Sequence, residues 1–255
     1  MIPEPIHAVL VRYSLLTAFA LAGALTWAGH ILAEKVFRGR IHGSAIAILA
    51  GLVLSAIGGI ATGGKQGIAD IPIFSGMALL GGAMLRDLAI VSTAFGARLE
   101  ELRGGGLIGA ISLLLGLFVS FATGGAVAWV FGYRDAVSIT TIGAGAATYI
   151  VGPVTGTALG AGPELLALSV AAGLVKAILV MVATPFVASA IGLDNPRSAM
   201  IFGGLMGTNS GVMAGLAATD PRLVPYGAMT ATFYTGLGCL LGPSVFFLII
   251  RTLTG

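Results

Sequence analysis

The feature that most constrains this chain is a series of long apolar segments that carry almost no charge. Each can cross a bilayer as a helix, since about 20 apolar residues span a hydrocarbon core about 30 Å thick. Only 9% of the residues are charged, against about 25% in ordinary globular domains, too few for a water-soluble surface. The sequence therefore predicts an all-α, polytopic membrane protein with full-length segments at 13–33, 44–61, 107–131, 164–191 and 227–250.

A sixth segment, 71–96, is long enough to span but is interrupted by Arg86 and Asp87. Asp87 is the one acidic residue well inside an apolar segment, which makes it a candidate ligand for a cation or a proton. Arg86 could hold the carboxylate of a substrate through two parallel hydrogen bonds. The alternative is that both residues anchor the segment at the membrane interface or contact another subunit.

Two further apolar stretches, 136–162 and 198–219, are broken by glycine and polar residues. They resemble each other, because "IGAGAAT" at 142–148 aligns with "FGGLMGT" at 202–208, 60 residues later, and a full-length span follows each. If each stretch returns to its own side, the intervening span makes the two enter from opposite faces. The sequence thus predicts discontinuous helices or re-entrant hairpins in an inverted repeat, as in many secondary transporters. Chance similarity between Gly/Ala-rich stretches is the alternative.

The repeat also suggests a division of the chain into two functional parts. Residues 1–135 are predicted to be N-terminal membrane helices that serve as a scaffold or contact partners. Residues 136–255 are predicted to form the inverted-repeat core, which contains both broken stretches.

The broken stretches are the predicted binding site. Glycine and proline leave backbone groups without helical partners, and a membrane protein tolerates such groups only inside protein or beside a water-filled cavity. Half-helix N-termini favour anions, while hydroxyls and free carbonyls suit Na⁺. The alternative is that the glycines only kink helices and the hydroxyls bond back to their own helix. The predicted substrate ligands are Thr148, Tyr149, Gly152, Thr155, Thr208, Asn209, Ser210, Lys176 and Arg86, and the predicted Na⁺ ligands are Thr141, Gly145, Thr208, Ser210 and Asp87.

Lys176 lies near the middle of the 164–191 segment. A charge at that depth costs about 2.5–3.5 kcal/mol on insertion scales, so the side chain should face protein or water. It either attracts an anionic substrate or has a structural partner, such as an acidic side chain or a carbonyl.

The sequence contains no HExxH motif, no paired-cysteine metal pattern and no P-loop, and its one cysteine is Cys239. We therefore expect no enzyme activity, no cofactor other than a coupling ion and no nucleic-acid partner. A secondary transporter of a small anion is the favoured function. An ion channel and a non-transporting membrane scaffold are the alternatives.

Several long stretches resemble the larger, MadM-type subunit of two-component malonate transporters. They include "GGAMLRDLAIVSTAFG", "TTIGAGAATYIVGPVTG", "GLVKAILVMVATPFVA" and "GLDNPRSAMIFGGLMGTNSG", and the likeness runs through almost the whole chain. The resemblance implies import of malonate with Na⁺ (or H⁺) across a bacterial cytoplasmic (inner) membrane. It also implies a smaller MadL-type membrane subunit as partner, and leaves open a higher hetero-oligomer. Elevator-like alternating access is the mechanism that the inverted repeat favours.

Overall fold

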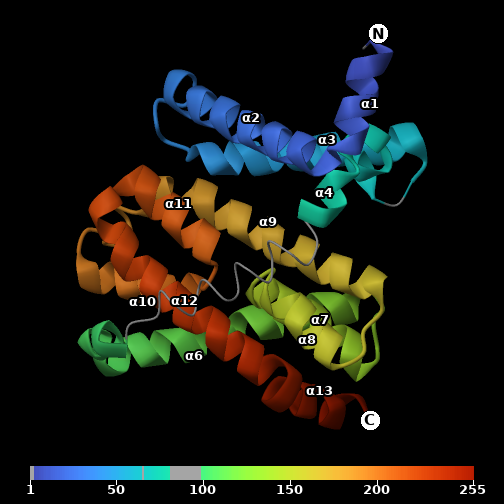
Figure 1. Cartoon of the computed structure of the whole chain (residues 1–255). Helices are drawn as coiled ribbons and strands as arrows, with labels where there is room; N and C mark the ends of the chain where they lie inside the picture. Colours follow the sequence, from blue (N-terminus) through green and yellow to red (C-terminus); the bar gives the residue numbers. More distant parts are fainter. Residues whose placement is uncertain (1–2, 65, 81–98) are drawn as a thin grey trace. The chain divides into compact units, whose positions relative to one another are not determined.

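The structure is a computed structural model that describes residues 3–64, 66–80 and 99–255. All regular elements in this part of the chain are helical, which confirms the all-α polytopic prediction. The chain divides into two compact units, Met1–Ser92 and Thr93–Gly255 (Figure 1), and each is described by itself.

The first unit is built on a pair of apolar helices, α2 (Ser14–Lys35) and α3 (Gly43–Thr62). They pack closely because Gly29 lies against the Gly43 carbonyl and Ala47, where a side chain would not fit. The other elements are α1 (Glu4–Arg12), the 3₁₀ turns η1 (Gly67–Asp70) and η2 (Pro72–Phe74), and α4 (Gly76–Leu79). The predicted sixth span therefore begins in 3₁₀ turns, and Arg86 and Asp87 lie outside the described residues.

The second unit combines long helices with short ones. The long helices are α6 (Leu99–Val130), whose membrane-spanning part begins at Gly106, α9 (Pro163–Val187) and α12 (Val224–Leu241). A π-helical turn, η5 (Gly242–Phe246), joins α12 to α13 (Phe247–Thr254). The short elements are α7 (Ala136–Ala147), α8 (Val151–Ala158), α10 (Pro196–Met206), α11 (Asn209–Thr219) and the 3₁₀ turn η4 (Pro221–Leu223).

Two apolar clusters form the core of this unit. One joins α9 and α12 to α10 and α11, and the other joins α6 and α12 to α7, α8 and η5. In the second cluster the rings of Phe121 and Phe246 stack with their centroids 4.3 Å apart. The short helices are therefore packed on the long ones rather than laid on the surface.

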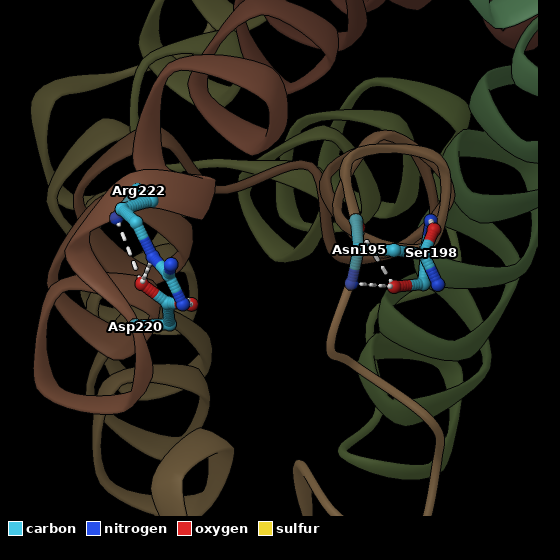
Figure 2. A network of polar contacts seen from close by, with 4 residues as sticks. All are labelled: Asn195, Ser198, Asp220 and Arg222. Carbon is cyan, nitrogen blue, oxygen red and sulfur yellow. Dashed lines mark hydrogen bonds and ion pairs between the residues drawn. The ribbon is translucent and has the colours of Figure 1, made fainter.

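Polar caps define where the short helices begin and end. Asp135 accepts a hydrogen bond of 2.8 Å from the Ser138 amide at the start of α7. Figure 2 shows the corresponding groups of the second broken stretch: Asn195 and Ser198 form a capping box at the start of α10, and Asp220 binds Arg222 after α11. Because these caps are exposed and polar, the outer ends of the short helices suit the membrane surface.

We expect Asn195→Ala to destabilise the first turn of α10 by about 0.5–2 kcal/mol, the usual cost of losing an N-cap. The reason is that the Ser198 amide, 3.0 Å from Asn195 Oδ1, loses its acceptor. Amide hydrogen exchange over 196–200 should become faster in the variant. Arg197→Ala, an exposed change in the same turn, is the control, and equal exchange in both variants would contradict the assignment.

Candidate substrate and ion site

The first broken stretch forms a helical hairpin, which we call hairpin 1 (α7 and α8). Gly152 lies against Gly145, and Gly156 lies against the methyl group of Thr141. In each pair the two residues are equally far along the chain from the break between α7 and α8, at Thr148 and Tyr149. The two arms therefore run antiparallel. The first stretch therefore doubles back rather than continuing as a kinked span, and α7 and α8 lie side by side (Figure 1).

The second broken stretch also doubles back, and we call it hairpin 2 (α10 and α11). The carbonyl of Ala199 and the side chain of Leu216 both lie against Gly227 on α12. In one continuous helix these two residues would be about 25 Å apart, at 1.5 Å per residue. The turn is made at Gly207, whose φ of 69° is in the left-handed region that glycine adopts at little cost.

Both hairpins pack along α9, and their contacts follow its length in order. Hairpin 1 occupies the N-terminal half of α9 and hairpin 2 the C-terminal half, so their tips meet near the middle and their open ends lie toward opposite ends of the helix. Close glycine contacts place Gly152 at Ser169, Tyr149 at Gly173, Gly211 at Ala177 and Gly215 at Thr184.

The two tips are in direct contact. The Tyr149 hydroxyl of hairpin 1 donates a hydrogen bond of 3.4 Å to Ser210 Oγ of hairpin 2. The ring of Tyr234, on α12, lies against Gly207 at the turn of hairpin 2 and leaves no room for a side chain there. The structure thus brings together predicted site residues that are about 60 positions apart in the chain.

The residues at the two tips differ in how their polar atoms are used. Thr148 Oγ1 accepts hydrogen bonds from the amides of Ile150 and Val151, at 3.0 and 3.4 Å, in the turn that leads into α8. Thr208 is the N-cap residue of α11, but its buried hydroxyl has no hydrogen-bond partner. Hairpin 2 therefore has a helix N-terminus without a side-chain cap.

Asn209 adds a second unsatisfied acceptor at the same place. Its Oδ1 is buried without a partner, while its Nδ2 lies 3.5 Å from Thr232 Oγ1. A polar atom buried without a partner costs roughly 1–3 kcal/mol in proteins, so such atoms commonly mark ligand or water sites. The N-terminus of α11, with its partial positive charge, can accept an anion.

Lys176 reaches from α9 into the region behind the tips. Its ammonium donates to Ser120 Oγ at 2.8 Å, to the Ala147 carbonyl at 2.9 Å and to the Tyr234 hydroxyl at 3.3 Å. These acceptors are neutral groups from α6, α7 and α12. Lys176 thus ties the end of α7 to two long helices and brings a positive charge close to both tips.

Other predicted ligands lie on the arms and not at the tips. Gly145 and Gly152 pack against each other and against Ser169, so they allow close helix approach. Thr141 faces Gly156, and Thr155 faces Gly242 of η5. Both hydroxyls are buried and have no partner. The tips and the arms of hairpin 1 are therefore separate polar sites.

Two residues that accept hydrogen bonds from Lys176, Tyr234 and Ser120, were not predicted as site residues. Ser120 is one of three hydroxyl residues in the 107–131 span, with Ser112 and Thr123, and its place near the middle of the span is the signal that could have drawn attention to it. Tyr234 lies in "TFYTG", where neighbouring hydroxyls gave no reason to prefer it. Thr230, Thr232 and Thr235 donate to carbonyls of their own helix, as ordinary helical threonines do.

The second unit also has cavities away from the tips. Two cavities of about 620 and 340 Å³ lie elsewhere in the second unit and are lined almost entirely by apolar side chains. The first lies between α9 and α10, and the second between α6, α7, η5 and α13. These grooves suit lipid or another apolar helix, whereas the tips combine the buried Thr148 and Thr208 with the partly exposed Tyr149 and Ser210.

The polar groups that come together in the second unit are mostly neutral oxygens. No group of three or more His, Cys, Asp or Glu side chains comes together in the part of the chain that the structure describes. The groups that converge are hydroxyls, an amide, carbonyls and one ammonium, which suit a carboxylate and a hard monovalent cation.

Comparison of the chain with known proteins gives a single family. No curated protein and no solved structure matches it. The family model of the malonate/sodium symporter MadM subunit matches residues 6–254, nearly the whole chain. The apolar helices of this chain, and the absence of enzyme motifs from its sequence, agree with that match. The chain therefore belongs to the malonate/sodium symporter MadM subunit family, a family of symporter subunits and not of enzymes.

Proposed function

We propose that this chain imports malonate, coupled to Na⁺, across a bacterial cytoplasmic membrane, together with a smaller MadL-type membrane subunit. The observation that carries the proposal is the contact between the two hairpin tips, next to a helix N-terminus that has no side-chain cap. Import coupled to H⁺ is the alternative. The uptake experiment below, with an imposed Na⁺ or H⁺ gradient, distinguishes the two coupling ions.

The tip residues have the donors that a small dicarboxylate needs. One carboxylate is assigned to the N-terminus of α11, where the Thr208 hydroxyl and the amides of Asn209 and Ser210 are available. Tyr149 and Ser210 face each other and can donate to the same anion. Lys176 supplies positive charge near the second carboxylate and holds the end of α7 in place.

The transport cycle is proposed to be elevator-like, with the site carried by an inverted repeat of one hairpin and one long helix. The order of contacts along α9 supports opposite entry of the hairpins, and the 60-residue offset between their sequences supports the repeat. In such a cycle Na⁺ and malonate must each strengthen the binding of the other.

Reconstitution tests the proposal directly. The chain would be placed in liposomes with and without the small subunit, and uptake of labelled malonate measured under an imposed Na⁺ or H⁺ gradient. We expect uptake driven by the Na⁺ gradient and requiring the partner. Uptake driven only by the H⁺ gradient would show that the coupling ion is H⁺ and not Na⁺. Failure of counterflow with unlabelled malonate would indicate a channel.

Alternating access can be followed at Ser210. A Ser210→Cys variant would be made after replacing the chain's one cysteine, Cys239, by alanine. A membrane-impermeant thiol reagent should label the new cysteine from either side of the membrane, in separate experiments. Labelling from one side only, in the presence and absence of Na⁺ and malonate, would contradict movement of the site between two faces.

We expect Thr208→Val to reduce malonate uptake at low substrate concentration by about 10- to 100-fold. A hydrogen bond to a charged group contributes about 1.5–3 kcal/mol, which corresponds to that range. Because the hydroxyl is fully buried and has no protein partner, its removal should not lower the thermal stability of the ligand-free protein.

Thr230→Val is the matched control for this variant. Thr230 is as deeply buried, but its hydroxyl donates to the Gly227 carbonyl of its own helix. We expect near-normal uptake. Equal uptake by the Thr208 and Thr230 variants would remove Thr208 from the site and favour a purely structural reason for the break.

A further inference from the structure

The threonines of the second unit follow a pattern that singles out hairpin 1. In a helix a threonine hydroxyl usually donates to the carbonyl three or four residues earlier. Thr184, Thr219, Thr230, Thr232 and Thr235 all do so, at 2.5–3.1 Å. The pattern shows that the α9, α11 and α12 backbones readily accept these bonds.

Three buried threonines on the arms of hairpin 1 do not follow it. Thr140 and Thr141 on α7 and Thr155 on α8 are each 0% exposed, and none of their hydroxyls has a hydrogen-bond partner. Each therefore forgoes the bond that its own helix offers, at a free-energy cost. A bound ligand that accepts hydrogen bonds from these hydroxyls, or is coordinated by them, would offset that cost.

Two of these hydroxyls lie at one level of the hairpin. Thr141 packs opposite Gly156, so the neighbouring Thr140 and Thr155 belong to the same cross-section of the antiparallel pair. The π-helical turn η5 packs against both α7 and α8 at this level. The hydroxyl of Thr155 points at Gly242, the first residue of that turn, and a side chain at 242 would collide with it.

The turn adds backbone oxygens. Pro243 has no N–H, so the carbonyl of Cys239 lacks its usual helical donor. Wider π-type turns inside α-helices are frequent at functional sites. In membrane transporters, carbonyls at broken helices together with hydroxyls are the usual ligands of Na⁺.

We propose that Thr140 and Thr155, with a backbone carbonyl at the start of η5, bind a Na⁺ ion between hairpin 1 and α12. This site rests on the proposed function and adds to it a place for the ion. It is separate from the tips, since Thr155 follows Thr148 by seven residues, about 10 Å along a helix. Thr141 is not included in the proposed site, because the group that it places against α8 is its methyl group, at Gly156.

Hairpin 2 cannot repeat this site. The residues 60 positions after Thr140 and Thr155 are Met200 and Gly215, which have no hydroxyl. Gly215 lies against Thr184, whose hydroxyl already donates to the Val180 carbonyl at 2.5 Å. One ion per chain is therefore expected at this level of the fold.

The site gives a physical route for coupling. An ion held by both arms of hairpin 1 and by η5 would fix the hairpin against α12, which also carries Tyr234 at the tip of hairpin 2. Malonate would then meet tips that are already ordered, and would bind more tightly when Na⁺ is present.

The test is direct Na⁺ binding to the purified full chain in detergent, without malonate. Thermal stability would be titrated with NaCl, with choline chloride keeping the ionic strength constant. We expect Thr140→Val and Thr155→Val each to raise the Na⁺ concentration for half-maximal stabilisation at least tenfold. Thr155→Ser, which keeps the hydroxyl, should bind almost as the wild type does, and Thr230→Val is the control for a buried threonine.

The outcomes separate this site from the proposed function. If Thr140→Val and Thr155→Val both bind Na⁺ with wild-type affinity, or the wild-type chain shows no specific Na⁺ effect, the site is overturned. If the wild-type chain binds Na⁺ and the variants lose it, but reconstituted protein imports no malonate, the site stands and the proposed function fails. If a valine variant does not fold, the alanine variant at the same position, Thr140→Ala or Thr155→Ala, takes its place and should weaken Na⁺ binding in the same way.

Discussion

Lys176→Met should reduce malonate uptake by about 100-fold or more while the protein still folds and inserts. Methionine has similar length and fills the same space, but it removes the charge and the three hydrogen bonds to Ser120, Ala147 and Tyr234. A charged donor close to a substrate carboxylate contributes about 1.5–3 kcal/mol, or about 10- to 100-fold in uptake, and loss of the bond to the Ala147 carbonyl adds to the effect by releasing the end of α7. Initial uptake rates in liposomes, alongside thermal unfolding of the purified protein, provide the measurement.

Two further variants show which property of Lys176 matters. Lys176→Arg keeps the charge but presents a planar group that does not fit three acceptors arranged around an ammonium, so we expect partial activity. Lys35→Met, in the exposed last turn of α2, removes a charge elsewhere and should leave uptake unchanged. Normal uptake by Lys176→Met would show that neither the charge nor the link between helices is needed.

Gly173→Ala should have the second large effect, on both stability and transport. An added Cβ would meet the backbone of Tyr149 and lie 2.6 Å from the Gly145 carbonyl, and backbone atoms cannot yield as side chains do. Overpacking of this kind costs about 1–3 kcal/mol. A displacement of the tip by about 1 Å can lower a rate by about 100-fold. We expect a lower unfolding midpoint and an uptake reduced by at least about tenfold.

Gly236→Ala is the matched control, because it lies in α12 and has nothing within 4 Å of its added Cβ. An alanine in an exposed helix position is usually more stable than glycine by about 0.5–1 kcal/mol. Its unfolding midpoint should stay the same or rise, with normal uptake. Should Gly173→Ala behave in the same way, the close packing of hairpin 1 on α9 would not matter for function.

The sequence was sufficient to predict the spans and the broken stretches, since both follow from local composition. Residues 107–131 and 164–191 are too apolar and too long to be anything but spans, and α6 and α9 occupy them. The breaks at Thr148 and Thr208 follow from glycine and polar residues within an apolar stretch. Whether each break turns the chain back was not decided by composition, because a kinked span has the same residues as a hairpin.

The division of the polar residues between tips and arms could not be predicted. Thr148 and Thr155 are both threonines in one short stretch, yet one accepts amide hydrogen bonds in the turn before α8 and the other faces η5. That difference depends on which face of α8 meets α12, a contact between segments about 90 residues apart. The hydrogen-bond acceptors of Lys176 come from three other helices, so they could not be predicted from the local sequence pattern either. The roles of the predicted ligands remain predictions, and Arg86 and Asp87 lie outside the described residues.

The lengths of the hairpin arms have an electrical consequence. The arms have 8 to 12 residues, about 12–18 Å at 1.5 Å per residue, roughly half of a hydrocarbon core. A site where two such arms meet is therefore about halfway across the core, and a charge that moves between it and either aqueous phase crosses part of the transmembrane voltage. A unit charge that crosses 100 mV there gains about 2.3 kcal/mol, so the rate of a cycle that moves net charge should depend steeply on membrane potential.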